Sequence, residues 1–146
     1  MEQRRLEIVR ELRSWVGTPW QHQGRTKGVA CDCIGLAVAA AEAAGRRVED
    51  IPRNYGRLPH RDSLRQYIEA NLLRIPAEEA RIADIVLLAW RTVPMHVGIL
   101  TPWRHEGGTA PFGLLHAMIE VRGVAEHRFD PARHNVVGYY RLPELE

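Results

Sequence analysis

The chain has 146 residues, 45% hydrophobic and 26% charged, which suits one globular domain with a core of its own. A formal charge of only +2, without a long Lys or Arg run, argues against nucleic-acid binding. No stretch approaches the roughly 20 apolar residues of a membrane span, and no signal-peptide apolar run follows the basic start. We therefore expect a single domain over residues 1–146, made in the cytoplasm and either kept there or exported within a larger assembly.

The first half of the chain has the periodicity of helices. Apolar residues recur at helical spacing over residues 2–16, and an alanine-rich apolar run over residues 33–44 ends at Gly45. Residues 20–29 between them have no period and are interpreted as an ordered loop. Residues 46–60 contain proline and glycine and predict a surface loop, after which Asp62 or Ser63 caps a short helix that holds Leu64, Tyr67, Ile68 and Leu72.

The second half is typical of β-strands. After a turn at residues 76–79, apolar runs predict strands over residues 84–90, 94–100, 112–121, 123–129 and 136–142, with a Gly-containing connection over 103–111. Because the connections are short, neighbouring strands are expected to be antiparallel. Helices followed by strands predict an α+β domain, with N-terminal helices packed on a mostly antiparallel sheet of about five strands.

Cys33 is the first candidate for chemistry, since it stands between a Gly-containing loop and the first turn of the alanine-rich helix. Unpaired N–H groups and the helix dipole stabilise an anion there, so we expect a lowered thiol pKa and a cysteine held partly as the nucleophilic thiolate. The same N–H groups could hold an oxyanion. Asp32 can accept first-turn N–H bonds and fix the loop. A small buried hydrophobic residue is the alternative for this cysteine.

His96 and His116 are the candidate partners of Cys33. His96 lies in an apolar strand, and imidazole is the usual base for a thiol because its pKa lies near neutrality. Gly98 shares the face of His96 and leaves room for another backbone, such as the helix that carries the nucleophile. His116 lies in the following strand and could hold one ring nitrogen of His96 so that the other points at the sulfur. A structural role in the core is the alternative for each histidine.

Cys31 and the remaining candidates give weaker signals. Cysteines and histidines match the ligand chemistry of zinc, but C-x-C is tighter than the usual spacing and the sequence has no second C-x₂-C. A C-x-C disulfide would be strained, so reduced thiols are expected. Trp20 and Trp103 are expected to pack in the core or at the rim of a site, or to line a substrate groove. A solvated surface position is the default for His60, His105, His127 and His134.

At these residues the sequence resembles the NlpC-type cysteine peptidases, bacterial cell-wall endopeptidases with a papain-like core. The resemblance covers most of the chain and rests on the motifs Gly17-Thr18-Pro19-Trp20, Asp32-Cys33-Ile34-Gly35-Leu36, Ala83-Asp84-Ile85-Val86, His96-Val97-Gly98-Ile99 and His116-Ala117. The G-V-x-C-D-C run at residues 28–33 and the closing residues 138–143 look like the subgroup found with phage tails and gene transfer agents. The missing signal peptide suits a protein carried to the cell wall inside a particle.

The resemblance implies hydrolysis of an amide in peptidoglycan stem peptides, typically between D-glutamate and a diamino acid. Cys33 would attack the carbonyl, His96 would act as base and then as acid, and His116 would orient His96. The backbone N–H of Cys33 would be one oxyanion donor. Trp20 stands where the family has a tyrosine whose hydroxyl helps the site, and an indole cannot replace that hydroxyl. His22 nearby could supply a polar group instead. The resemblance therefore makes Trp20, His22 and Asp32 the candidates for contacting the substrate and the oxyanion. No metal and no organic cofactor is implied.

Two other functions stay open from the sequence. A tail or assembly protein could keep this fold without activity, and the departure at Trp20 keeps that reading in view. A zinc-binding module is the second. The expected partners are a peptidoglycan peptide and the proteins of a phage-tail or gene-transfer-agent particle, with no nucleic acid and no membrane span.

Overall fold

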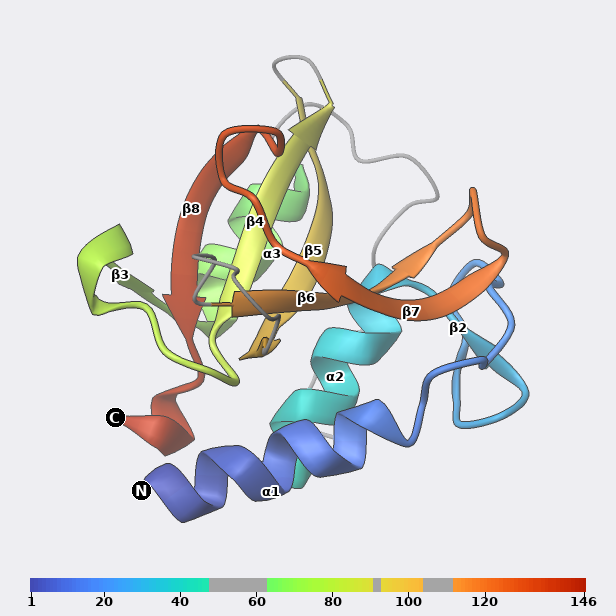
Figure 1. The fold of residues 1–146 in the computed structure, drawn as a ribbon, viewed down its shortest axis with the longest axis horizontal. Coiled ribbons are helices and arrows are strands. Elements are labelled where there is room, and N and C mark those ends of the chain that lie inside the picture. Colours follow the sequence, from blue (N-terminus) through green and yellow to red (C-terminus); the bar gives the residue numbers. More distant parts are fainter. Residues whose placement is uncertain (48–62, 91–92, 104–111) are drawn as a thin grey trace.

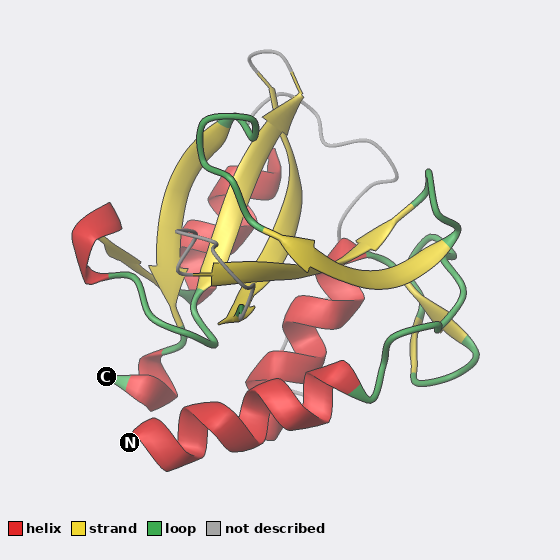
Figure 2. Cartoon of the chain, in the orientation of Figure 1, coloured by secondary structure: helices red, strands yellow, loops and turns green. Residues whose placement is uncertain are grey.

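Helices pack on an antiparallel sheet in the computed structural model, which describes residues 1–47, 63–90, 93–103 and 112–146 (Figures 1 and 2). The two chain ends lie close together, beside the start of the first helix (Figure 1). Most of the predicted loop at 46–60, the Asp62 cap, His60, His105 and most of the connection at 103–111 lie outside the described residues.

The described helices are α1 (Glu2–Arg13), α2 (Cys33–Ala43) and α3 (Ser63–Asn71). The first ends three residues before the predicted end at Val16, because the chain leaves the helix to meet the sheet. The amide of Gly17, at a φ of +90°, donates to the carbonyl of Val124. Trp15 nevertheless stays buried, as its place in the apolar stripe predicted. None of the described helices is long and apolar enough to cross a bilayer.

Within the described residues the main sheet has six strands, one more than the sequence predicted. In sheet order they are β3 (Leu73–Ile75), β8 (Val136–Arg141), β4 (Ile85–Trp90), β5 (Val93–Pro102), β6 (Phe112–Met118) and β7 (Gly123–Arg128). Each pairing among them is antiparallel, as expected. The unpredicted strand is β3, whose three residues directly follow α3 and pair with β8. A segment so short has no readable alternation of its own.

Residues 20–29, interpreted as an ordered loop, contain part of a second small sheet. Its strands are β1 (Arg25–Thr26) and β2 (Ala30–Cys31), which pair antiparallel with Arg25 opposite Cys31. Next to it, the backbone of Trp20 bridges to Cys31 in parallel. The loop is therefore fixed to the segment that enters α2.

Two apolar layers cover the two faces of the sheet. The larger joins the helices to alternate sheet residues such as Leu87, Ile99 and Leu115. The smaller lies on the opposite face and contains Val86, Leu88, Leu100, Leu114 and Phe129. This alternation gives central strands buried on both faces, which is the reason for their continuous apolar runs.

A buried ion pair joins the N-terminal helix to the sheet. Arg5 and Asp84 are 1% and 0% exposed, and their side chains are 3.0 Å apart. Arg141 from β8 also contacts Asp84, at 2.8 Å. A buried charge is tolerated only when it is paired and hydrogen-bonded, and Arg5 also donates to the carbonyl of Ile82. This network holds α1, the start of β4 and the end of β8 in one arrangement.

Candidate active site

Asp32 begins the helix that carries Cys33. Its backbone is extended, and its carboxylate accepts hydrogen bonds from the amides of Gly35 and Gln23, each at 2.7 Å. One carboxylate therefore caps α2 and holds the preceding loop at once, as the sequence predicted. The side chain is 4% exposed, so these bonds form in a desolvated place.

Gly35 is required because the loop crosses the first turn of α2 at this point. A Cβ on Gly35 would overlap the carbonyl oxygen of Gly24. A Cβ on Gly24 would in turn lie 2.6 Å from the backbone of Ala30 and Cys31. Two glycines thus permit a close backbone crossing directly behind Cys33.

Cys33 begins the helix that packs against β5 and β6. These strands pair only from Ile99 opposite Leu115 to Pro102 opposite Phe112, and α2 contacts both of them. The backbone amide of Val97, ahead of the paired stretch, hydrogen-bonds the sulfur. Since Val97 directly follows His96, this bond brings the half-buried thiol to the strand position of the predicted base.

The structure brings His96 and His116 together. Nε2 of His96 lies 2.7 Å from Nδ1 of His116, and the ring centroids are 4.9 Å apart. His116 is buried and His96 is half-buried. With Nε2 of His96 engaged in this bond, Nδ1 is the nitrogen left for the thiol. This is the arrangement of a base held by an orienting group.

The space beside Gly98 is not filled by the helix, contrary to the sequence interpretation. A Cβ there would lie 2.5 Å from Leu114 and 3.3 Å from the Cβ of His116. Gly98 therefore lets the side chains of β6 approach β5 on the face opposite the helices. The room at Gly98 is thus taken by Leu114 and by the Cβ of His116.

The thiol and the imidazole are both neutral in this arrangement. Burial, together with the Asp32 carboxylate, raises the pKa of Cys33 to about 12, although the amides of Val97 and Ile34 lower it in part. Burial lowers the pKa of His96 to about 4 and that of His116 to about 2. The predicted lowering of the thiol pKa was therefore wrong, because desolvation outweighs the helix N-terminus. The site therefore holds a neutral thiol, bound by the amide of Val97, and a neutral imidazole on the preceding residue that can accept the thiol proton during attack.

The other predicted site residues lie around the entry to α2. The half-buried ring of Trp20 packs against the core, next to the backbone of Cys31. Nδ1 of His22 is 4.0 Å from the Asp32 carboxylate, with 30% of its side chain exposed. Cys31 is fully buried, and its sulfur contacts the carbonyl of Asp32 at 3.2 Å. Both cysteines are free thiols.

His127 and His134 were interpreted as surface residues, yet they continue the histidine pair. Nε2 of His127 lies 2.6 Å from Nε2 of His116, and the ring of His134 stacks on that of His127 at 5.8 Å. Strand alternation puts His127 on one face with Ala125, but the register that sets Ala125 opposite His116 is seen only in the structure. Among the described residues, no group of three or more His, Cys, Asp or Glu side chains is arranged to hold a metal ion.

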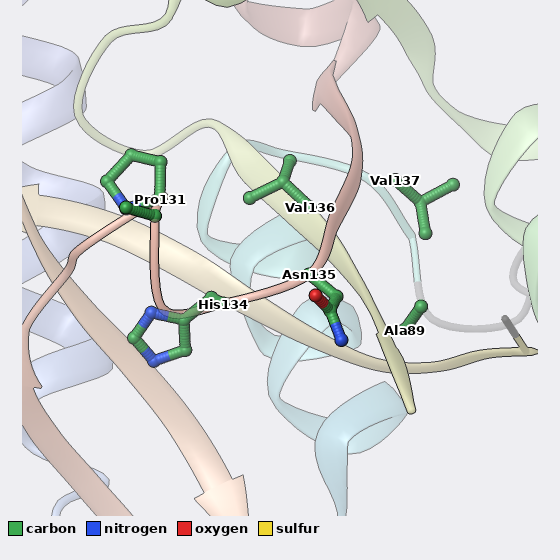
Figure 3. Close-up of a pocket in the computed structure, with 7 residues that line it drawn as sticks. Ala89, Pro131, His134, Asn135, Val136 and Val137 are labelled. Carbon is green, nitrogen blue, oxygen red and sulfur yellow. The ribbon is translucent and has the colours of Figure 1, made fainter. Parts of the chain in front are cut away.

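An open hollow of about 600 Å³ lies next to His134 (Figure 3). Its lining includes His134, Asn135 and Val136 but not Cys33 or His96. Trp103 lines a different hollow, beside Leu6 and Arg13 of α1. Neither hollow is lined by the thiol, so the predicted place of Trp103 beside the site finds no support here.

No family model matches this sequence, and no curated protein matches it. Solved structures do resemble the fold. An NLP/P60-family protein of Staphylococcus aureus, described as similar to a lipoprotein, superposes with a TM-score of 0.66 at 19% identity over 97% of this chain and 42% of its own. The chain therefore spans less than half of that protein.

Two other solved structures match the chain over nearly their whole length. The NlpC/p60 domain of the peptidoglycan hydrolase SagA has a TM-score of 0.64 at 18% identity, covering 94% of this chain and 98% of its own. RipD of Mycobacterium tuberculosis is described as a non-catalytic NlpC/p60 domain protein adapted to peptidoglycan binding. It has a TM-score of 0.62 at 16% identity, covering 98% of this chain and 99% of its own. Together with the helix-borne Cys33 beside paired histidines on the sheet, these similarities show that the chain has the fold of NlpC/P60 domain proteins.

Proposed function

We propose that this protein is a cysteine peptidase that hydrolyses an amide of peptidoglycan stem peptides, between D-glutamate and a diamino acid. The observation that carries the proposal is the His96–His116 pair next to the strand residue whose amide binds the Cys33 sulfur. The fold is shared with a domain of the peptidoglycan hydrolase SagA. The identity is too low for more than the fold, so the substrate is argued from the site motifs.

In the proposed reaction, Nδ1 of His96 takes the proton of the Cys33 thiol as the sulfur attacks the peptide carbonyl. The resulting imidazolium gives that proton to the leaving amine, and a thioester remains on the sulfur. Water then attacks the thioester, again with His96 as base, and the free acid and the thiol are restored. His116 holds Nε2 of His96 throughout, which keeps Nδ1 directed at the reacting atoms.

In the resting state the imidazole of His96 is unprotonated at neutral pH and so has a lone pair to accept a proton. A pKa of about 4 also makes it a weak base, so the proposed proton transfer needs the charge that develops on the sulfur to be stabilised. Amides that hydrogen-bond the Cys33 sulfur stabilise the charge that develops on it. We assign the Cys33 amide as one oxyanion donor, with Trp20, His22 and Asp32 around the substrate.

The proposal extends to the setting in which the enzyme works. Residues 28–33 and 138–143 resemble the phage-tail and gene-transfer-agent subgroup, so the enzyme would be made in the cytoplasm and carried to the wall within a particle. Co-purification with tail proteins from particles of the source organism tests this part. Its absence from purified particles would contradict the setting and leave the chemistry standing.

Digestion of defined muropeptides, with mass analysis of the products, tests the activity. We expect cleavage after D-glutamate, and we expect Cys33→Ala to abolish it while the fold is kept. Cys31→Ala is the matched control and should stay active, because that sulfur is fully buried behind Asp32. If Cys31→Ala were inactive and Cys33→Ala active, our choice of Cys33 as the nucleophile would be wrong.

A second candidate is peptidoglycan binding without cleavage. Two observations favour it, namely the raised pKa of the Cys33 thiol and the fold shared with a non-catalytic relative. Wild-type protein that binds purified cell-wall sacculi but releases no peptide from any defined muropeptide would support this function in place of the peptidase.

A further inference from the structure

Three histidines on successive strands form one hydrogen-bonded chain that ends on a backbone carbonyl. His96 on β5 meets His116 on β6 at 2.7 Å, and His116 meets His127 on β7 at 2.6 Å. Nδ1 of His127 lies 2.8 Å from the carbonyl oxygen of Arg128. Both ring nitrogens of His116 and of His127 are therefore engaged.

The carbonyl sets the direction of every bond in this chain. A carbonyl only accepts, so Nδ1 of His127 carries the hydrogen in the bond to Arg128. A neutral imidazole has one donor and one acceptor, so Nε2 of a neutral His127 accepts from Nε2–H of His116. Nδ1 of His116 then accepts from Nε2–H of His96. The last free position is Nδ1 of His96, which is left with its lone pair.

The surroundings favour the neutral forms of His96 and His116 and hold the ring of His127 in place. Burial lowers the pKa values of His96 and His116 to about 4 and about 2, so both rings are unprotonated at neutral pH. His134 stacks on His127 with an angle of 17° between the rings, and its own Nδ1 lies 2.7 Å from the carbonyl of Asp130. This packing holds the His127 ring in the plane that reaches both His116 and Arg128.

We infer that His127 is a positioning residue for the proposed peptidase, which through the Arg128 carbonyl fixes the tautomers of His116 and His96 and leaves Nδ1 of His96 as the basic nitrogen. The inference rests on the proposed function for its catalytic meaning, and on the hydrogen-bond chain for its physical content. The opposite tautomer of His96 would carry its hydrogen at Nδ1 and could not accept the thiol proton. His127 thus acts two rings away from the sulfur.

The direct test is ¹⁵N NMR of the histidine rings in the free protein near neutral pH, where nitrogen shifts identify each tautomer. We expect hydrogen at Nε2 of His96 and His116 and at Nδ1 of His127. In His127→Phe, His116 loses its acceptor, and the His96 signals should move toward a mixture of tautomers. His127→Gln can accept from His116 through its amide oxygen and should restore the wild-type tautomer. His134→Phe keeps the stacking and is the matched control.

Kinetics on muropeptides give the second readout. We expect kcat to fall at least 10-fold in His127→Phe with KM unchanged, and to recover substantially in His127→Gln. Hydrogen at Nδ1 of His96 in the wild type, or unchanged His96 tautomers in His127→Phe, would overturn the inference. Because NMR needs no substrate, a protein that cleaves no muropeptide would refute the proposed function alone.

Discussion

The half-buried imidazole of His96, which is desolvated in the folded protein, makes the stability of this protein depend on pH. Its native pKa of about 4 lies below the ordinary 6.5, so below pH 6.5 the unfolded chain binds a proton that the native protein excludes. The stabilisation from His96 is therefore present above pH 6.5 and is lost as pH falls toward 4. A pKa shift of this size corresponds to about 3 kcal/mol in the free energy of unfolding.

Replacement of His96 by Gln isolates this contribution. The glutamine amide can still donate to Nδ1 of His116, but it does not titrate. Measured by urea unfolding, the free energy of unfolding of the wild type should fall by about 3 kcal/mol more than that of His96→Gln between near-neutral pH and about pH 4. His116 is present in both proteins, so its own titration cancels to a first approximation.

The matched control removes a buried methylene group and leaves every titratable group in place. Leu100→Val lies on the same strand and is fully buried, so it should cost about 1 kcal/mol at both pH values. If wild type and His96→Gln differ by the same amount at both pH values, within about 1 kcal/mol, the His96 ring is not held neutral by burial. The protonation states on which the proposed base depends would then be refuted.

Two substitutions and one labelling experiment test the packing of the fold and the state of the thiol. Gly35→Ala should cost about 2 kcal/mol or more in urea unfolding because its Cβ overlaps the Gly24 carbonyl, and a neutral effect would contradict the crossing. Asp84→Asn should cost about 3–5 kcal/mol, since it leaves Arg5 buried without its counter-charge; a loss under about 1 kcal/mol would show the pair to be dispensable. Iodoacetamide should label Cys33 about 1,000-fold more slowly than a free thiol near neutral pH, as measured by peptide mass, and a labelling midpoint below about 8.5 would show a resting thiolate.

The sequence predicted the class of the fold and the segments of the site because the signals for them are local. A Gly loop, Asp32 and an alanine-rich run identify the start of α2, and the structure places the Asp32 cap there. Apolar runs found the long strands, since central strands buried on both faces have no polar alternation. What had no local signal was missed, such as the three-residue β3 and the early end of α1 at the sheet.

The pairing of β8 beside β4 also required the tertiary structure. This strand follows β7 in sequence, yet it lies between β3 and β4 in the sheet. Sheet order depends on which strand edges are free and which apolar faces must be covered, and both are properties of the assembled chain. The described strands are antiparallel as predicted, but their order could not be read from connection lengths.

The sequence by itself determined which side chains were available for chemistry, namely one cysteine at a helix start and two histidines in apolar strands. Only the tertiary structure decided their protonation states and which side chains they contact. Desolvation, which depends on everything packed around a group, made the thiol and both rings neutral where local reasoning expected a thiolate. The register between β6 and β7 brought His127 into hydrogen-bonding distance of His116, because side chains far apart in sequence become neighbours only when strands pair.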